Sequence, residues 1–509
     1  MKQKIFQAKY LTAAVFFLLI YFPVFHHLDW EPIHNWDESL FAMRASYMAE
    51  EGKYLPNYKH WIEDGPRHLN SKPPFTTWIQ VLSVKTFGIS ELALRIPTAL
   101  AVFSTILLFL YAARNILGDI RIGYCAGFVL VTSRGFMREH VARTADQDAF
   151  MAFYMLAAAI AFYQYLESTT DRQRWKWLAI ITLSTIAAAL TKYVLGFFFM
   201  PAFAIYAAHK GQLLNILKRA STWLAAALVI AAVAVWFAAM DAAIPGFIHR
   251  AFSHEMIDRY TSTLDVHYAP WFYYIKNLHN YRFMPWLYFL AVPFFVIFSK
   301  KAAGSRPSNL LMLMLLSALS LLVIISFSQT KTPHYDAVVY PPLALLAGFG
   351  LLEVLKACAS LFRLQTNQEY RYLAFVLVPF FVFVPFLMEP YNKTLEKTYT
   401  PKLQDANLQY GYLFRQLEHY PGIRRFTVLY PGFDGQAVFY AGLYNRKKGY
   451  QISLSDELEK VQPGDTIMAC DKKIVRHLFE KWELQGITSY DKCFLATVIS
   501  EKKLPLPND

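Results

Sequence analysis

Long apolar segments constrain the fold of this chain more than any other feature of its sequence. An α-helix needs about 20 predominantly apolar residues to cross the hydrocarbon core of a bilayer. Eleven segments have this character, at about residues 9–27, 92–113, 120–137, 147–166, 174–190, 193–208, 220–240, 283–299, 309–327, 338–357 and 371–388. The sequence therefore predicts a polytopic α-helical membrane protein with about 11–13 spans.

The composition agrees with this prediction. Of the 509 residues, 55% are hydrophobic and only 17% are charged, whereas ordinary soluble domains carry about 25% charged residues. The same values exclude a disordered chain, a collagen-like chain and a small disulfide scaffold. The first apolar segment follows Lys2, Lys4 and Lys9 and lacks a small-residue cleavage site, so we expect a retained signal anchor.

The distribution of Lys and Arg predicts the orientation in the membrane, because short cytoplasmic loops are enriched in these residues. With the N-terminus in the cytoplasm, every cytoplasmic segment is basic. These segments carry Lys2, Lys4, Lys9, Arg114, Arg121, Arg172, Arg174, Lys176, Lys210, Lys218, Arg219, Lys300, Lys301, Arg306, Lys356, Arg363 and Arg371. Eleven spans then place the C-terminus outside the cytoplasm. We assign the net charge of +13 to topology, and we expect no nucleic-acid partner.

The last part of the chain, residues 390–509, is expected to form a soluble α/β domain after a membrane domain of residues 1–389. Its expected strands are 426–430, 450–454, 465–469 and 494–499, and its expected helices are 436–444 and 472–481. Cys470 and Cys493 lie in this domain. Outside the cytoplasm they form either one disulfide or two separate buried thiols.

Two non-cytoplasmic segments between spans are long, residues 28–91 and residues 241–282. The first contains two stretches with apolar residues at helical spacing, about 38–52 and 72–88. We expect both to form amphipathic helices that lie on the membrane surface. The two long segments together are predicted to form the roof of an active site.

Four carboxylates lie where these segments meet the membrane. Asp37 and Glu38 follow the first span, and Asp146 and Asp148 precede the apolar run that begins at Ala149. Acidic residues in a first helical turn or at a cap stabilise the helix, whereas carboxylates that face a cleft act as a general base or bind a divalent ion. We name all four as candidate catalytic residues, and Asp37 and Asp148 also as candidate metal ligands.

Candidate phosphate-binding residues lie on the same predicted side of the membrane. They are Lys72, Lys192, Arg259, Lys331 and Tyr335. Basic side chains near hydrocarbon either bind an anion or extend their charged ends to the interface. Because a topology derived from other residues places all of these groups on one side, we expect a shared external cleft. Its charges favour a lipid phosphate as ligand, with chemistry at the lipid head group.

In sequence order, these motifs resemble those of the lipid-linked-sugar glycosyltransferases of the GT-C superfamily. The likeness is to the branch of lipid A aminoarabinose transferase and the protein O-mannosyltransferases, and it covers about residues 1–350. The matching motifs are Asp37-Glu38, Lys72-Pro73-Pro74 with Trp78, Arg95-Ile96-Pro97, Ala142-Arg143-Thr144 with Asp148, Leu190-Thr191-Lys192, Glu255 with Arg259-Tyr260, Pro270-Trp271-Phe272-Tyr273-Tyr274, Pro285-Trp286, and Lys331 with Pro333-His334-Tyr335. The chain departs from the family at Met256, where a His is often found, and in residues 54–71.

The resemblance implies transfer of a sugar from a polyprenyl-phosphate carrier of the undecaprenyl type to an acceptor outside the cytoplasm, with inversion. Lys72, Arg259 and Tyr335 would stabilise the leaving phosphate. Asp37 would orient the acceptor or accept its proton, and Asp148 would hold the acceptor or a divalent ion, the one cofactor expected. The implied setting is the bacterial inner membrane, with a periplasmic site and a glycolipid of the lipid A type as acceptor.

Three alternatives stay open on the sequence. A protein acceptor would make the chain a protein O-glycosyltransferase. A transporter or flippase for a lipid-linked sugar would place charged groups near the bilayer midplane, whereas the charges here gather at one face. A scaffold protein would use residues 390–509 for binding a partner and leave the charged cleft without a catalytic role.

Overall fold

The computed structural model describes residues 2–55, 72–253, 269–300, 302, 304–361, 384–432 and 434–502. The chain folds into two compact units. The first, here called the helical unit, comprises Met1–His27, Ser71–Thr76 and Ile96–Tyr399. The second, here called the mixed unit, comprises Leu28–Asn70, Thr77–Arg95 and Thr400–Asp509. Each unit is therefore assembled from segments that are far apart in the sequence.

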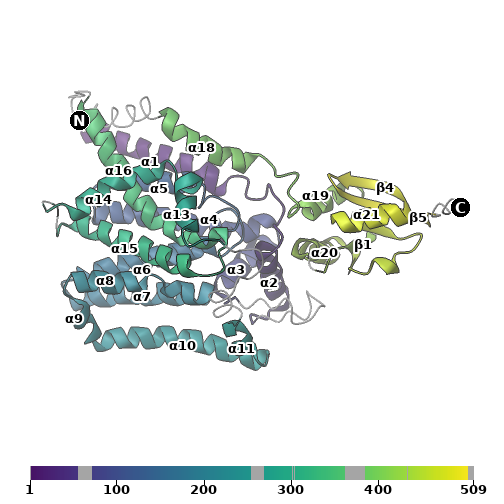
Figure 1. Cartoon of the computed structure of the whole chain (residues 1–509), viewed down its shortest axis with the longest axis horizontal. Coiled ribbons are helices and arrows are strands. Elements are labelled where there is room, and N and C mark those ends of the chain that lie inside the picture. Colours follow the sequence, from purple (N-terminus) through teal and green to yellow (C-terminus); the bar gives the residue numbers. More distant parts are fainter. Residues whose placement is uncertain are drawn as a thin grey trace. The chain divides into compact units, whose positions relative to one another are not determined.

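Helices build the helical unit, and Figure 1 labels most of them. They are α1 (Lys2–Phe25), α5 (Ile120–Thr132), α6 (Asp148–Leu166), α7 (Asp171–Lys192), η2 (Tyr193–Phe197), α8 (Met200–His209), α9 (Leu213–Leu217), α10 (Ala220–Ala243), α11 (Phe247–Phe252), α13 (Tyr273–Asn277), η4 (Leu278–Arg282), η5 (Trp286–Leu290), α14 (Ala291–Phe298), α15 (Arg306–Phe327), η6 (Pro333–Val339), α16 (Tyr340–Leu361) and α18 (Val384–Tyr399). Two helices contribute residues to both units, α3 (Phe75–Phe87) and α4 (Glu91–Asn115).

The predicted class, a polytopic α-helical membrane protein with a C-terminal α/β part, is confirmed, and among the described residues fewer helices than the predicted 11–13 are long and apolar enough to span a membrane. Within the described ranges, six helices are long and apolar enough to cross a membrane, or seven if one bent pair counts as a span. They are α4, α6, α7 continued by η2, α10, α15, and η6 continued by α16. The bent pair is Tyr273–Arg282 with Trp286–Phe298, at an angle of 112°.

Helix length explains most of this difference. The apolar helix α5 has 13 residues, which corresponds to a rise of about 20 Å against a hydrocarbon core of about 30 Å. The apolar part of α1, Tyr10–Phe25, is also shorter than a span, and α8 has only 10 residues. Most of the segment predicted at 371–388 lies outside the described residues. Apolar composition thus identified the apolar helices. Breaks within these helices determine how many of them are long enough to span a membrane.

Close helix packing in the helical unit depends on small residues. A Cβ atom on Gly348 of α16 would lie 2.6 Å from the Cα atom of Ala126 on α5, closer than real Cβ contacts. Small residues at helix interfaces allow such close approach of two backbones within a membrane. The glycine therefore permits α16 to lie directly against α5.

The C-terminal part of the mixed unit is a five-stranded sheet with helices. The strands are β1 (Arg425–Leu429), β2 (Gln451–Ser455), β3 (Thr466–Ala469), β4 (Trp482–Tyr490) and β5 (Cys493–Glu501), in the order β2-β1-β3-β5-β4. Strand β1 pairs in parallel with β2 and β3, whereas β5 is antiparallel to β3 and β4. The other elements of this unit are α2 (Asp37–Glu51), α19 (Gln409–Gln416), η8 (Leu417–His419), α20 (Gly435–Lys448), η9 (Leu458–Lys460) and α21 (Lys472–Lys481).

The predicted surface helices correspond to α2 and α3, and all predicted elements of the C-terminal part are present. The sequence did not predict β4 or α19. Strand β4 is an edge strand that pairs only with β5, and most of its residues are not buried. An edge strand with one covered side carries little apolar alternation, which is the signal that identifies strands.

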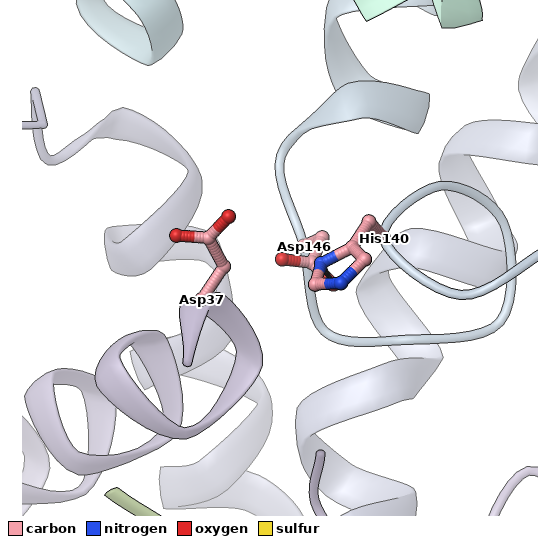
Figure 2. A group of neighbouring side chains, drawn as sticks. All are labelled: Asp37, His140 and Asp146. Carbon is pink, nitrogen blue, oxygen red and sulfur yellow. Dashed lines mark ion pairs between the residues drawn. The ribbon is translucent and has the colours of Figure 1, made fainter. Parts of the chain in front are cut away.

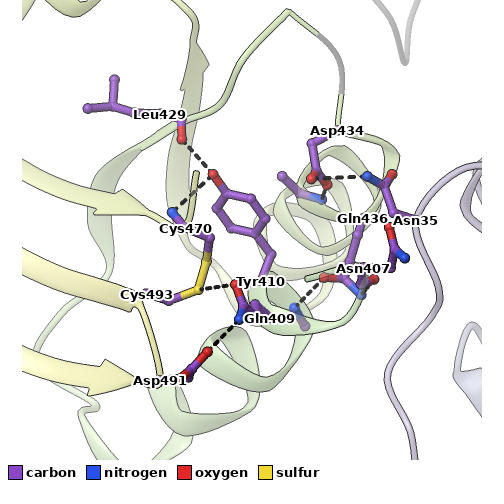
Figure 3. The surroundings of a disulfide bond; sticks show 12 residues. Asn35, Asn407, Gln409, Tyr410, Leu429, Asp434, Gln436, Cys470, Asp491 and Cys493 are labelled. Atoms are coloured by element: carbon purple, nitrogen blue, oxygen red, sulfur yellow. Dashed lines mark hydrogen bonds between the residues drawn. A yellow bond between two sulfur atoms is a disulfide. The ribbon is translucent and has the colours of Figure 1, made fainter. Parts of the chain in front are cut away.

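Cys470 and Cys493 form a disulfide, which resolves the two readings left open by the sequence (Figure 3). Cys470 follows β3, and Cys493 begins β5. The bond thus joins two neighbouring antiparallel strands. The predicted domain boundary at 389/390 stays a prediction: α18 continues across it to Tyr399 within the helical unit, and Leu28–Asn70 lies in the same unit as Thr400–Asp509.

Candidate functional site

A buried ion pair joins two predicted site residues at the point where α6 begins and α7 ends. Lys192 Nζ lies 2.7 and 2.8 Å from the two carboxylate oxygens of Asp148. The side chains are 14% and 4% exposed. A carboxylate and an ammonium group this well buried are costly unless they are paired. The pairing partner of Lys192 is thus a carboxylate of the same site, and the role of Asp148 as a metal ligand stays a prediction.

The loop before α6 holds a second carboxylate, Asp146, next to a histidine (Figure 2). His140 Nδ1 lies 3.7 Å from Asp146 Oδ2, and Thr144 Oγ1 donates a hydrogen bond of 2.6 Å to the same oxygen. Burial opposes ionisation of Asp146, but the nearby His140, the hydrogen bond from Thr144 and the charge of Lys192 outweigh it, so its pKa is lowered. Asp146 is therefore a buried, ionised carboxylate.

Arg143 anchors this loop to the end of the first helix. Its guanidinium donates to the carbonyl oxygens of Pro23, His26 and His27 at 2.7, 3.0 and 2.9 Å. Carbonyl groups at a helix C-terminus lack intrahelical partners. Arg143 supplies these partners, and it thereby fixes the loop that carries Asp146.

Basic side chains from three segments of the helical unit act electrostatically on His334. The charges that act on its ring are those of Lys192, His140, Arg138 and Lys72. The rings of His140 and His334 are 5.1 Å apart. The helical unit thus brings the predicted residues Lys72 and Lys192 to the same region as the loop of Asp146.

The short segment that carries Lys331 and Tyr335 is held by a buried arginine. Arg282 Nη1 donates to Asp336 Oδ2 at 2.9 Å and to the carbonyl oxygen of Pro333. Tyr340 Oη donates to the same Asp336 oxygen at 3.2 Å. Tyr335 stands between the bound residues Pro333 and Asp336, so this network holds its backbone, and its ring lies 5.3 Å from that of His334.

Lys331 is buried in the same segment, and its Nζ donates to the carbonyl oxygen of Ser328. Only 6% of the residue is exposed. Its candidate role in phosphate binding stays a prediction. Arg259, the other predicted phosphate ligand, lies outside the described residues, as do Glu255, Met256 and Tyr260.

Asp37 and Glu38 form the first turn of α2 in the mixed unit and have different surroundings. Glu38 is 0% exposed, and its two oxygens accept hydrogen bonds of 2.7 and 2.9 Å from Arg95. The backbone N–H of His34 also donates to Glu38 Oε2. Asp37 is only partly buried. Of this pair, Asp37 is therefore the one that solvent reaches.

Arg95 explains why Glu38 is buried. Besides Glu38, its guanidinium donates to the carbonyl oxygens of Leu28, Glu31 and Pro32 at 2.7 to 2.8 Å. It satisfies five acceptors with five donors, the full capacity of an arginine side chain. Arg95 thus holds the whole turn that leads from the end of α1 to α2.

Sequence reasoning gave no role to three groups that shape the site: His140, Arg95 and the pair Arg282–Asp336. His140 stands four residues before the motif residue Thr144, and Arg95 begins the Arg-Ile-Pro motif, so both had a positional signal. The pairing of Arg282 with Asp336 depends on contacts between distant segments and had none. His140 and Asp146 are donor types that bind divalent ions such as Zn²⁺.

Comparisons with known proteins relate the chain to membrane glycosyltransferases. Residues 71–238 match the family described as dolichyl-phosphate-mannose-protein mannosyltransferase. An uncharacterized protein of Aquifex aeolicus is 29% identical over 347 residues, which cover 65% of this chain and 62% of that protein. Undecaprenyl phosphate-alpha-4-amino-4-deoxy-L-arabinose arabinosyl transferase 2 of Pseudomonas fluorescens is 25% identical over 356 residues, 68% of this chain and 60% of that protein. The chain thus spans about three fifths of the length of these curated relatives.

The fold agrees with these matches. The crystal structure of ArnT from Cupriavidus metallidurans bound to undecaprenyl phosphate superposes with a TM-score of 0.67 at 18% identity and covers 96% of this chain and 97% of that one. An archaeal oligosaccharyltransferase from Archaeoglobus fulgidus gives a TM-score of 0.52 at 14% identity, over 81% of this chain and 58% of that one. In sequence and in fold, the chain is similar to membrane glycosyltransferases of the GT-C type, including those named as aminoarabinose transferases, as its motifs predict.

Proposed function

We propose that this protein transfers a sugar from a polyprenyl-phosphate carrier, of the undecaprenyl type, to a lipid A-type glycolipid with inversion at the anomeric carbon. One observation carries the proposal. The helical unit buries two carboxylates, Asp146 and Asp148, among positive groups at one end of α6 and α7. Such a concentration of ionised groups beside hydrocarbon is costly and typical of a functional site.

The proposed setting is the periplasmic side of the bacterial inner membrane. The basic loops favour an N-terminus in the cytoplasm, with the site and the C-terminal domain on the other side. The disulfide supports this orientation, because disulfides persist in the periplasm and are rare in the cytosol.

The positive groups would act on the donor. When the bond between the sugar and the carrier phosphate breaks, negative charge develops on the phosphate oxygens, and prepositioned cations stabilise it. We assign this role to Lys72, Arg259 and Tyr335. Lys192 and Lys331 are further candidates for binding the donor phosphate. Asp148 would hold Lys192 in place through their two hydrogen bonds.

Asp37 would act on the acceptor. An acceptor hydroxyl attacks the anomeric carbon from the face opposite the phosphate, and its proton passes to a carboxylate. A phosphate acceptor on a glycolipid is already anionic, so Asp37 then orients it and accepts no proton. Glu38 has the supporting role, because Arg95 binds both of its oxygens.

A divalent ion is the one cofactor that the residues would suit. The 3.7 Å separation of His140 Nδ1 and Asp146 Oδ2 allows both atoms to bind one ion at about 2.0–2.2 Å. Asp37 and Asp148 are the ligands predicted from the sequence. A bound ion would supply positive charge near an anionic acceptor. Metal analysis of the purified protein and of a His140→Ala variant tests this part, since the proposal requires the wild type to retain metal that the variant lacks.

A protein acceptor is the second candidate, because the family matched by residues 71–238 is described as a protein mannosyltransferase. The two candidates share the donor and differ in the product. Incubation of the membrane-reconstituted protein with the labelled donor, a lipid A acceptor and an unfolded protein acceptor distinguishes them by which product is labelled. A transporter or flippase would move labelled lipid across vesicles and label neither.

The decisive experiment compares four variants in that transfer assay. Asp37→Asn and Lys72→Ala should lose transfer, because the first removes the acceptor carboxylate and the second a phosphate ligand. Asp29→Asn and Lys53→Ala are matched controls at exposed positions, and they should keep wild-type activity. Mass spectrometry of co-purified lipids should find the polyprenyl phosphate or its sugar adduct in the wild type and less of it in Lys72→Ala. Full activity of Asp37→Asn would refute the proposed mechanism.

A further inference from the structure

The segment that leads into Asp37 is held by residues from the C-terminal part of the mixed unit. Asn35 Nδ2 donates to Asp434 Oδ2 at 3.2 Å, and the N–H of Gly435 donates to Asn35 Oδ1 at 3.0 Å. The backbone N–H of Asn35 donates to the carbonyl oxygen of Asn407 at 3.1 Å. Figure 3 shows Asn35 beside Asp434, Asn407 and Gln436. Asn35 therefore has its amide side chain and its backbone N–H bound by residues 407–435.

Ile33 is bound in the same way at both backbone polar groups. Its N–H donates to Tyr440 Oη at 3.0 Å, and its carbonyl oxygen accepts from Gln436 Nε2. Tyr440 in turn donates to Glu91 Oε1 at 2.7 Å, and Gln436 Oε1 accepts from the N–H of Gly411 at 2.8 Å. Every one of these groups is buried or partly buried. The contacts form a continuous hydrogen-bonded clamp on residues 33–35.

The clamp extends to the residue directly before Asp37. Trp36 has φ 68° and ψ −122° and precedes α2 without a side-chain cap. Positive φ values are disfavoured for a bulky residue and persist only where the surrounding structure imposes them. The N–H of Trp36 donates to Asn35 Oδ1 at 2.9 Å, the same atom that Gly435 binds. The conformation that sets the direction of α2 is thus imposed in part from α20.

We propose that the C-terminal α/β domain positions the acidic turn, with Asn35, Asp434 and Gln436 as positioning residues for Asp37. The consequence for catalysis rests on the proposed function. Reacting groups must be held within a fraction of an ångström, and residues locked by a supporting set of hydrogen bonds achieve this. Arg95 fixes Glu38 on one side of the turn, and the clamp fixes residues 33–36 on the other.

A pair of matched variants tests this proposal in the full-length, reconstituted protein. Asp434 caps α20 through the N–H of Ala437, and Asp471 caps α21 through the N–H groups of Lys473 and Ile474. Replacing either residue by Ala removes a helix cap of similar worth. We expect Asp434→Ala to lower kcat by about tenfold to hundredfold with an unchanged KM for the donor. Asp471→Ala should lower the unfolding temperature equally and leave kcat unchanged.

Hydrogen exchange of the amides of residues 33–39 provides a readout independent of activity. Asp434→Ala and Asn35→Ala, which removes no helix cap, should both raise exchange there, and Asp471→Ala should not. Because Asn35 and Asp434 are in contact, the double variant should lose little more than either single variant. Faster exchange with an unchanged kcat would overturn the positioning role. If the wild type transfers no sugar, the proposed function fails. The clamp is tested independently of it, because unchanged hydrogen exchange in Asp434→Ala and Asn35→Ala would overturn the clamp.

The helical unit also contains an apolar cavity. Its volume is about 400 Å³, and its lining comes from α6, α7, η2, α8, α9 and α10. Two of its polar lining residues are satisfied by backbone carbonyl groups: Thr182 donates to the carbonyl oxygen of Leu178, and Thr222 donates to that of Ile216. Tyr165 and Phe162 line the cavity from α6. From Asp148 to Tyr165, α6 rises about 26 Å, which separates the cavity from the charged site.

Basic residues surround one edge of this cavity. Arg219 stands two residues after the lining residue Leu217, and its Nη1 atom lies 3.5 Å from the hydroxyl of Tyr165, another lining residue. Lys218 adjoins it and is exposed, and Lys210 lies 3.8 Å from Glu167. Positive side chains at the membrane surface attract anionic lipid head groups. We infer that an acyl chain of an anionic phospholipid occupies the cavity, with its phosphate at Arg219 and Lys218.

Two adjacent alanines of α10 test this inference. Ala226 lines the cavity, whereas Ala227 is exposed and is not part of its lining. Native mass spectrometry with added phosphatidylglycerol should find the lipid retained by the wild type and by Ala227→Trp, and lost from Ala226→Trp. Arg219→Gln should lower the apparent affinity by about fivefold. Equal retention by both Trp variants, or retention of polyprenyl phosphate in preference to phosphatidylglycerol, would overturn it.

Discussion

Removal of the Arg95 side chain should destabilise the mixed unit strongly. Arg95→Met keeps an apolar side chain of similar length but removes every hydrogen bond to Glu38 and to the carbonyl oxygens of Leu28, Glu31 and Pro32. Glu38 is then left 0% exposed without its partner. Breaking a buried ion pair by removing one partner costs about 3–5 kcal/mol.

The assay is thermal unfolding of the detergent-solubilised protein. For a unit of this size, each kcal/mol lowers the transition by about 2–4 °C, so Arg95→Met should lower it by about 6–20 °C. Arg425→Met is the matched control, because Arg425 is exposed at the start of β1. It should shift the transition by no more than about 2 °C, since surface substitutions stay within about 0.5 kcal/mol.

A double variant separates the charge from the packing. Arg95→Met with Glu38→Leu removes both charges, so no buried carboxylate lacks its partner. Because such a replacement is often neutral relative to the ion pair, the double variant should be more stable than Arg95→Met alone. Equal instability of the two, or a shift of less than about 2 °C for Arg95→Met, would refute the assignment of Arg95 as the residue that holds this turn.

Three further predictions concern other positions. Gly411→Ala should destabilise the mixed unit by about 1–3 kcal/mol in the same thermal assay, because the new Cβ atom would overlap Pro32 Cβ. Burial raises the pKa of Asp434 to about 6, so its contribution to stability is complete below its ordinary pKa and is lost as pH rises through about 6. The unfolding temperature should follow that decline from pH 4 to 7, and Asp434→Asn should abolish it. Lys192→Met leaves Asp148 buried without its partner and should cost about 3–5 kcal/mol, whereas Lys192→Met with Asp148→Leu should recover most of it.

The sequence predicts the fold where a single physical signal is strong. Apolar length identified the embedded segments, and helical spacing identified α2 and α3. Turn residues and apolar runs located four of the five strands. Strand β4 was missed because it is an edge strand. Among the described residues, fewer helices than predicted reach the length of a span, because helix breaks such as the one between Arg282 and Trp286 leave no apolar signature.

The site could be predicted only as a set of residue types on one side of the membrane. The sequence placed Asp37 and Glu38 together as candidate catalytic groups, yet burial gives them different surroundings. Glu38 is bound by Arg95, 57 residues further along the chain. No local pattern encodes such a pairing, because it depends on which segments pack together in the folded unit. His140 lies in the same loop as Asp146, and its approach to that carboxylate depends on the conformation of the loop, which residue spacing alone does not predict.

The mixed unit is assembled from segments near both ends of the chain, and this affects the order in which the protein folds during synthesis. Residues 28–38 leave the ribosome early, and Glu38 can pair with Arg95 soon afterwards. The partners of Asn35 come much later, since Asp434 is 399 residues away. Domains generally fold as units as the chain is synthesised, but this unit stays incomplete until its last segment has been made. A chain that is truncated before that segment would insert its helices yet lack the finished turn around Asp37, so completion of synthesis itself becomes a condition for activity.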